Sequence, residues 1–198
     1  MGLEFHIARA MKDKEESFKV RYKVFCEECS LIDKEKFETG IETDKYDLSD
    51  NTFHFVAFHE GKAVGTVRLI ISPSDMNGRY GFPVEEIVDL SHYKKNNVNV
   101  AEISRSCALP EYRKKVIMMN LWKCTYQFSR KNNITHFCTS AHPGKAEMYG
   151  KLGFFKIGEE KKYSAVRNNP ALPLMMILDK IPEPYKTFFE EESRNIFV

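Results

Sequence analysis

A β-hairpin with an arginine inside one of its apolar strands constrains the fold of this chain most strongly. Residues 53–59 and 63–71 each alternate in polarity, and Glu60-Gly61-Lys62 between them predicts the turn. Arg68 stands in the middle of the second, otherwise apolar run. Because a buried guanidinium needs an anionic partner, we expect Arg68 either to pair with an acidic loop or to hold a ligand carboxylate. Gly65, in the same run, indicates a bulge or a close backbone approach.

An acidic segment between residues 30 and 49 offers such anionic partners. Its carboxylates belong to Asp33, Glu35, Glu38, Glu42, Asp44 and Asp47. A run of carboxylates is usually a solvated loop, but carboxylates are also the natural hydrogen-bond acceptors for an ammonium group. Asp44 and Asp47 are therefore candidates to receive an amine or a cationic acceptor.

Residues 98–109 predict a strand that carries both an acid and a base. Alternation along a strand places Glu102 and Ser104 on one face, and Arg105 and Cys107 on the other. If Glu102 is buried, its pKa rises toward the range of a useful general base. The alternative is that Glu102 and Arg105 belong to a buried ion network.

Three consecutive cations follow this strand. Pro110 ends the strand, and we expect next a helix that starts with Arg113, Lys114 and Lys115 and buries an apolar stripe. A helix N-terminus already carries partial positive charge, so these cations are unfavourable for helix stability alone. With exposed backbone N–H groups they are typical of a site for phosphate or another anion, and an ordinary solvated helix start is the alternative.

The remaining periodicities predict one mixed α/β domain without a linker. Helices are expected over residues 15–29 and from His142-Pro143 to Gly153. Further strands are expected at residues 3–8, 134–140, 154–163 and 172–178. The last strand is nearly continuous in apolar residues, so we expect it to lie within the sheet rather than at its edge. The domain is expected to span residues 1–182 and to be followed by a polar tail, residues 183–198, that packs loosely.

Composition and charge argue against several classes of protein. The 198 residues are 42% hydrophobic and 29% charged, as in ordinary soluble domains, and the net charge of +2 gives no reason to expect nucleic-acid binding. Apolar runs of about 18 residues and signal-peptide features are absent, so we expect a cytoplasmic protein without a transmembrane segment. Five cysteines fit a reducing compartment, and the lone Cys26–Cys29 pair favours buried helix cysteines over a metal site.

Several catalytic motifs are also missing. The sequence contains no G-x-S-x-G, P-loop, HExxH or GxGxxG motif, which argues against hydrolase, NTPase, zinc-protease and dinucleotide-binding functions. After these exclusions, the chemistry that the sequence still supports is acid–base catalysis around Glu102, with cations nearby.

Several sequence blocks resemble a known superfamily. Tyr149-Gly150-Lys151-Leu152-Gly153-Phe154 resembles the Y-x-x-L-G-F segment of the GNAT acyltransferases. Further stretches resemble the autoinducer-synthase-like branch of that superfamily. They are residues 21–28, 42–47 and 64–69, Phe82, and Glu102-Ile103-Ser104-Arg105. This branch includes N-acyl-homoserine-lactone synthases, long-chain N-acyl amino acid synthases and acyltransferases associated with exosortase systems. The resemblance implies an α/β (α+β) fold, a single GNAT-like domain with a central mixed β-sheet flanked by helices.

The same resemblance implies an activity. The implied enzyme is an N-acyltransferase that moves a long-chain fatty acyl group from acyl carrier protein or acyl-CoA to a small amine. An amino acid is the favoured acceptor. The resemblance implies no permanently bound cofactor, and an acyl carrier protein as a transient partner. The positions that match the branch and would shape the acceptor pocket are Arg21, Phe25, Asp44, Asp47, Arg68, Phe82 and Arg105.

Roles in the reaction follow from the resemblance as well. Glu102 would act as the base, and Tyr149 matches the position where many GNAT enzymes keep a general acid for the leaving thiolate. A packing role is the alternative for Tyr149. Backbone N–H groups near Cys107 and Ala108 would polarise the thioester carbonyl, and the cations of residues 113–115 would bind the donor.

Two departures from the branch bear on the substrates. Leu31 stands where the homoserine-lactone synthases have tryptophan, which favours an amino acid over S-adenosylmethionine as acceptor. Residues 113–118 lack both glycines of the R/Q-x-x-G-x-G/A loop, so the cations there would bind a phosphopantetheine phosphate or an acidic carrier surface. The alternatives are a homoserine-lactone synthase, an acetyl-CoA-dependent N-acetyltransferase, and a non-enzymatic acyl-binding or sensing module.

Overall fold

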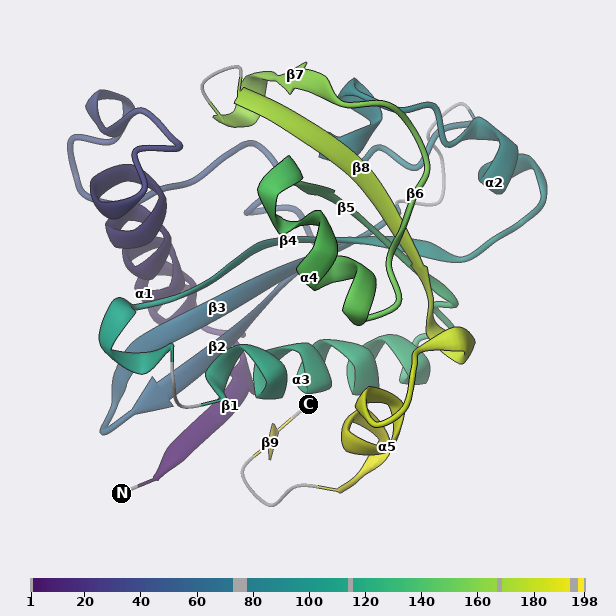
Figure 1. The fold of residues 1–198 in the computed structure, drawn as a ribbon. Coiled ribbons are helices and arrows are strands. Elements are labelled where there is room, and N and C mark those ends of the chain that lie inside the picture. The colour runs from purple at the N-terminus through teal and green to yellow at the C-terminus, as the bar shows by residue number, and fades with distance from the viewer. Residues whose placement is uncertain (1, 73–77, 114–115, 167–168, 193–195, 198) are drawn as a thin grey trace.

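A mixed β-sheet with helices on both faces forms the body of the molecule (Figure 1). The computed structural model describes residues 2–72, 78–113, 116–166, 169–192 and 196–197. The strands are β1 (Leu3–Ile7), β2 (Thr52–His59), β3 (Lys62–Ile71), β4 (Val100–Ala108), β5 (His136–Ala141), β6 (Phe155–Lys156), β7 (Lys161–Tyr163), β8 (Asn169–Ile177) and β9 (Ile196–Phe197). The α-helices are α1 (Met11–Arg21), α2 (Ser91–Lys95), α3 (Ile117–Lys131), α4 (Ala146–Lys151) and α5 (Tyr185–Glu190).

The strand order confirms the predicted mixed sheet. The strands follow the order β6-β8-β5-β4-β3-β2-β1-β9, and β7 also pairs with β8. The β4–β5 and β1–β9 pairs are parallel and the other pairs are antiparallel. The apolar strand β8 lies inside the sheet, as expected.

The strand predicted over residues 154–163 is wrong as a single element. Its two ends form β6 and β7, which pair with separate parts of β8. The break lies beside Pro173 of β8, whose ring leaves no backbone N–H to continue the ladder. Gly158 lies in this break, where a Cβ would be only 3.0 Å from the Pro173 ring.

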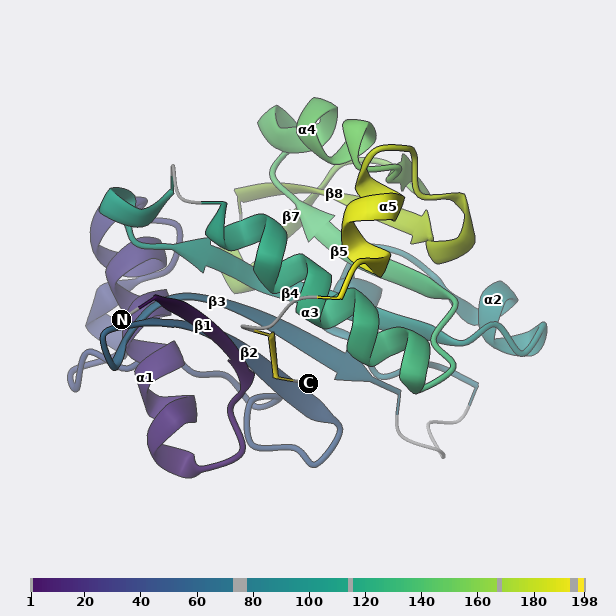
Figure 2. The ribbon, with the colours of Figure 1, turned by 90° about the horizontal axis from the view of Figure 1, so that it is seen from below.

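Alternation along β2 separates two apolar cores on opposite faces of the sheet. Phe55 packs into the larger core beneath α3, whereas its neighbour Val56 packs into a smaller cluster with Val20 and Val24 on the α1 side. Helix α3 therefore covers one face and α1 the other, with α5 beside α3 (Figure 2). Among the described residues, no helix has both the length and the apolar character needed to cross a bilayer.

The first helix differs from the predicted α-helix over residues 15–29. It begins earlier, at Met11, and from Tyr22 to Glu28 it continues as a π-helix. The Cys29 N–H bonds to the Val24 carbonyl, five residues back, so the last part of the helix is wider than the predicted i, i+4 spacing assumes. Cys26 in this segment is buried, but Cys29 is exposed, so burial is confirmed for only one of the two.

The helix predicted directly after Pro110 is also corrected. Residues Pro110–Tyr112 form a 3-10 turn, and Val116 has a left-handed backbone with φ of 57° before α3 begins at Ile117. A left-handed residue interrupts a helical path, so the turn at Pro110 does not continue into α3. Arg113 therefore precedes the helix instead of starting it, and residues 114–115 lie outside the described residues.

A β-bulge in β4 overturns the predicted alternation after Ser104. Arg68 pairs with Ser104, whereas Thr66 pairs with Cys107, so β4 has one extra residue between these pairs. Arg105 in the bulge has φ of 52°. Regular alternation would place Cys107 on the same face as Ile103. Ile103 packs on the α3 side of the sheet, but Cys107 packs on the α1 side.

The loose packing expected for residues 183–198 is wrong for α5 and β9. Phe189 of α5 is buried against α3, Tyr126 donates a hydrogen bond to Glu190 at 3.1 Å, and Gln127 donates to the Phe189 carbonyl at 3.1 Å. Strand β9 pairs with β1. The aromatic residues among the polar ones give α5 an apolar side that packs on the domain.

The close approach of α3 to Gly65 allows a direct test of the packing. A Cβ at Gly65 would lie 2.8 Å from Cγ2 of Ile117 and 3.3 Å from the Cys107 carbonyl oxygen. We expect Gly65→Ala to lower the free energy of unfolding by about 1–3 kcal/mol, because the packed core must shift to admit the methyl group.

Gly150→Ala is the matched control for this prediction. Nothing lies within 4 Å of a Cβ at Gly150, which is in α4. Because alanine favours a helix, this variant should be neutral or more stable by up to about 1 kcal/mol. Urea denaturation measures both variants, and equal stability of the two would contradict the close approach at Gly65.

Candidate active site

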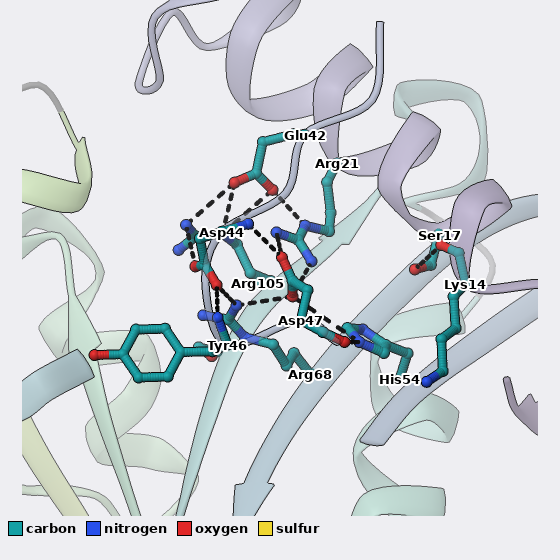
Figure 3. A network of polar contacts seen from close by, with 11 residues as sticks. Lys14, Ser17, Arg21, Glu42, Asp44, Tyr46, Asp47, His54, Arg68 and Arg105 are labelled. Carbon is teal, nitrogen blue, oxygen red and sulfur yellow. Dashed lines mark hydrogen bonds and ion pairs between the residues drawn. The ribbon is translucent and has the colours of Figure 1, made fainter. Parts of the chain in front are cut away.

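A buried network of ion pairs lies beside the sheet, between α1, β3, β4 and the acidic loop (Figure 3). Its members are Arg21, Arg68, Arg105, Glu42, Asp44 and Asp47. The three guanidinium groups come from three different elements, and the three carboxylates come from one loop. Charge in the network is therefore balanced, and the loop is tied to the sheet and to α1.

Arg21, the last residue of α1, is fully buried. Its terminal nitrogens donate to both carboxylate oxygens of Asp47 at 2.7 and 2.9 Å, and its Nε donates to Glu42. Burial alone would lower the pKa of Arg21, but Glu42 and Asp47 raise it above its ordinary value. Burial alone would raise the pKa of Asp47, but Arg21 holds it well below its ordinary value. Both side chains are therefore charged in the folded protein.

Arg68 in β3 is paired with carboxylates of the acidic loop, as we expected for an arginine inside an apolar strand. Its NH1 donates to Asp44 at 2.7 Å and to Asp47 at 2.9 Å, and its Nε donates to the Ser104 hydroxyl at 3.1 Å. The salt-bridge alternative for Arg68 is thus confirmed. Asp47 also accepts from the Asp44 N–H at 2.6 Å, which folds the loop back on itself.

Arg105 joins the network because of the bulge. Its Nε donates to Glu42 at 3.2 Å, and its NH2 donates to Asp44 at 3.1 Å. Regular alternation would have pointed this side chain to the opposite face of the sheet. Arg105 is therefore part of an ion network, with Glu42 and Asp44 as its direct partners, and its role in binding stays a prediction.

Glu102 stands apart from these ion pairs. Its Oε2 accepts a hydrogen bond from the Val84 N–H at 2.8 Å, and its buried Oε1 has no partner among the described residues. Burial raises the pKa of Glu102 to about 7, although the Val84 N–H and the charges of Arg68 and Arg105 oppose the rise. A carboxylate with this pKa is suited to accept and release a proton near neutral pH.

A pocket opens where β4 and β5 separate. The two strands pair in parallel only from Val100–His136 to Glu102–Cys138, although β4 continues to Ala108. The space beyond the pairing is a pocket between β4, β5, α4 and β8. Its lining residues are Phe25, Leu31, Ile32, Ser104, Arg105, Ser106, Thr139, Ser140, Ala141, His142, Lys145, Tyr149, Tyr163, Val166, Asn169, Pro170 and Ala171. We call it the strand-gap pocket.

A second pocket lies over the ion network. It is lined by Ile32, Lys36, Phe37, Glu42, Thr43, Asp44, Lys45, Tyr46, Arg79, Phe82, Pro83, Glu86, Arg105, Tyr163, Ser164 and Ala165. We call it the loop pocket. It shares Ile32, Arg105 and Tyr163 with the strand-gap pocket, so the two pockets meet at these side chains.

Five of the fourteen predicted site residues line these two pockets, Asp44 of the loop pocket among them, whereas the buried Glu102 lines neither. Phe25 and Tyr149 line the strand-gap pocket, Phe82 lines the loop pocket, and Arg105 lines both. Arg21 lies behind the loop, with no exposed surface. The roles of these residues in binding and catalysis stay predictions.

The predicted donor residues are placed differently. Cys107 and Ala108 do not line the strand-gap pocket, which is reached instead by residues 104–106. Arg113 pairs with Glu28 at 2.6 Å, and its Nε donates to the Ala108 carbonyl at 3.1 Å. Its guanidinium is therefore engaged by protein groups.

Three residues of the site were missed as candidates from the sequence. Glu42 pairs with two arginines. Because each buried arginine needs an anionic partner, several buried arginines could have pointed to Glu42 as well. Ser140 and Tyr163 line the pockets, but nothing in their sequence neighbourhood marks them.

Comparisons with known proteins decide the family. Residues 16–177 match the family model of the N-acyl amino acid synthase FeeM. The chain belongs to this family. A relative, the L-ornithine N(alpha)-acyltransferase of Rhizobium meliloti (strain 1021), is 30% identical over 157 residues, which are 72% of this chain and 51% of that protein. The chain thus spans about half the length of this relative.

Solved structures of the family and its neighbours share the fold. FeeM, an N-acyl amino acid synthase from uncultured soil microbes, has a TM-score of 0.73 at 20% identity, over 90% of this chain and 92% of that one. BjaI, a CoA-dependent acyl-homoserine lactone synthase, has a TM-score of 0.66 at 18% identity, over 95% and 88% of the two chains. An acyl-CoA N-acyltransferase from Pseudomonas aeruginosa has a TM-score of 0.61 at 17% identity, over 89% and 99%. The predicted GNAT-like fold is confirmed.

Asp47→Asn tests whether the ion network stabilises the fold. Asparagine keeps the shape of the side chain but leaves the guanidinium groups of Arg21 and Arg68 without the charge that balances them. We expect the free energy of unfolding to fall by about 3–5 kcal/mol at pH 7. Asp50→Asn, an exposed carboxylate a few residues away, is the control and should change stability by at most about 0.5 kcal/mol.

The effect of Asp47→Asn should depend on pH in a defined direction. The folded-state pKa of Asp47 lies well below its ordinary value of 3.8, so its contribution is complete above that pH and is lost as the pH falls toward the folded value. The stability difference between the native protein and Asp47→Asn should therefore narrow below about pH 4. Denaturation curves at several pH values measure it, and a difference that stays constant would contradict the assignment.

Proposed function

We propose that the protein is an N-acyltransferase that moves a long-chain fatty acyl group from a thioester, on acyl carrier protein or coenzyme A, to the amine of an amino acid. The observation that carries the proposal is the meeting of two pockets of different chemistry at Arg105 and Tyr163, both of which interact electrostatically with the buried Glu102. Membership of the N-acyl amino acid synthase family supports the same reaction.

The strand-gap pocket suits the acyl thioester. Most of its lining is apolar or aromatic, including Phe25, Leu31 and Tyr149. The edge of β4 from residue 103 onward has no β5 partner among the described pairs. Its backbone can therefore bond to the amides of an extended phosphopantetheine arm, which carrier protein and coenzyme A have in common.

The loop pocket suits an amino acid as acceptor. It is lined by Asp44 and Glu86, whose carboxylates also accept from Arg68, Arg105 and Ser164, and by the cations of Lys45 and Arg79. A zwitterion needs both signs of charge, the carboxylates for its ammonium group and the cations for its carboxylate. The ornithine acceptor in the name of the Rhizobium relative makes a basic amino acid the first acceptor to test.

Glu102 supplies the base in this proposal. The acceptor arrives as an ammonium ion and must lose a proton before its nitrogen can attack the thioester carbonyl. Glu102 takes this proton, through a water molecule, because burial has raised its pKa to about 7. Tyr149 lies in the strand-gap pocket with its pKa raised by burial to about 12, so its phenol is protonated near neutral pH.

Mass spectrometry of lipid extracts from cells that overexpress the protein tests this function. We expect a new N-acyl amino acid in cells with the native protein, and a signal lower by about 10²–10⁴-fold with Glu102→Gln, because the amide cannot accept the proton. Glu111→Gln, an exposed residue of the 3-10 turn after β4, is the control and should match the native protein.

The identity of the lipid separates the rival functions. An acyl-homoserine lactone would contradict the amino acid acceptor and would identify S-adenosylmethionine as the acceptor. An unchanged lipid profile with the native protein would contradict the proposed reaction and favour acetyl transfer or a binding role. Full product formation by Glu102→Gln would leave the reaction in place and contradict the role of Glu102 as the base.

A further inference from the structure

Tyr163 occupies the boundary between the two pockets. It is the last residue of β7, it is 3% exposed, and it lines both the strand-gap pocket and the loop pocket. Only Ile32 and Arg105 share this position among the described lining residues. If acyl donor and acceptor occupy one pocket each, the reacting atoms must meet beside these three side chains.

The hydroxyl of Tyr163 is the group at this boundary that is suited to proton transfer. Ile32 has no polar side-chain atom, and the Arg105 guanidinium is bonded to Glu42 and Asp44. The side chain of Ser140, which also lines the strand-gap pocket, interacts with the Tyr163 phenol and opposes the rise in its pKa, as a donor to the phenolate would. Ser140 is therefore the candidate to position this hydroxyl.

Tyr149 is less well placed for the same task. It lines the strand-gap pocket but not the loop pocket, so it lies on the donor side of the boundary. Its ring packs against Trp122 and Phe154 at centroid distances of 5.8 and 5.3 Å. These are packing contacts, and they do not orient a hydroxyl.

We propose that Tyr163 is the general acid that protonates the sulfur of the leaving thiol, with Ser140 as the residue that positions its hydroxyl. This inference rests on the proposed N-acyl transfer and adds a catalytic residue to it. The pKa of Tyr163 lies above its ordinary value because of burial and the nearby Glu102 carboxylate, so the phenol is protonated when the reaction needs a donor.

The protons and bonds of the proposed step balance. Glu102 takes one proton from the acceptor ammonium, and the free amine attacks the thioester carbonyl to form a carbon–nitrogen bond. The carbon–sulfur bond then breaks, and the sulfur takes the proton of the Tyr163 hydroxyl. The Tyr163 phenolate takes the remaining extra proton from the nitrogen, which leaves a neutral amide, a neutral thiol and a regenerated phenol. Glu102 returns its proton to water.

A comparison of two acyl donors tests the role of Tyr163. One donor is the acyl-pantetheine thioester, and the other is the aryl thioester of the same fatty acid. An arenethiolate leaves without protonation because arenethiols are much stronger acids than alkanethiols. The purified native protein, Tyr163→Phe and Tyr149→Phe are assayed with each donor, and the melting temperature of each variant is recorded.

We expect a donor-dependent loss in Tyr163→Phe alone. With the pantetheine donor its kcat should fall by about 10²–10³-fold while KM stays within about threefold of the native value. With the aryl donor its kcat should return to within about tenfold of the native value, because no acid is needed. Tyr149→Phe should change the two rates by the same factor.

Several results would overturn the inference. Equal losses with both donors in Tyr163→Phe would assign it a structural role, and a donor-dependent loss in Tyr149→Phe alone would make that residue the acid. If Tyr163→Phe does not fold, Ser140→Ala replaces it and should lower kcat by about tenfold with the pantetheine donor only; equal rates would then reject the inference. Absence of product from the native protein with either donor would instead contradict the proposed N-acyl transfer.

Discussion

The pairing of Arg21, Arg68 and Arg105 with the carboxylates of one loop is the interaction on which the loop-pocket side of the molecule depends. Each arginine belongs to a different element, and two of them have almost no exposed surface. Removing one partner from such a network leaves a buried charge that nothing balances, which is far more costly than losing an exposed ion pair. The loop that forms one wall of the loop pocket is therefore fixed in place by charge rather than by regular secondary structure.

The same buried region gives two carboxylates opposite properties. Asp47 has two arginine partners, so its pKa falls well below the ordinary value despite burial. Within the described part of the chain, Glu102 has only the Val84 N–H as a hydrogen-bond partner, so burial dominates and its pKa rises to about 7. One carboxylate is suited to hold structure and the other to exchange protons, and the difference comes from their partners rather than from their chemical type.

Hydrophobic alternation and charge were enough to predict much of this arrangement. The hairpin follows from period-two alternation, and the interior position of β8 follows from its nearly continuous apolar run. The acidic partners of Arg68 follow from the cost of burying a lone guanidinium. The bulge at Arg105 could not be predicted, because a single left-handed residue reverses the faces of a strand without any glycine to mark it.

Two further features were beyond the sequence for similar reasons. The place of Tyr163 at both pockets depends on the pairing of β7 with β8, which is a property of tertiary packing. The late start of α3 depends on local backbone geometry at Val116, where a β-branched residue adopts a conformation that propensities argue against.

The dependence of kcat on pH tests the central claim, that Glu102 is the base for acyl transfer, most directly. With saturating donor and acceptor, the rate of the native protein should rise through an apparent pKa near 7, because the Glu102 carboxyl must be ionised to accept the acceptor proton. In Glu102→Gln the rate should be lower and should no longer rise near pH 7. The same rise in Glu102→Gln would assign the ionisation to another group and contradict the account.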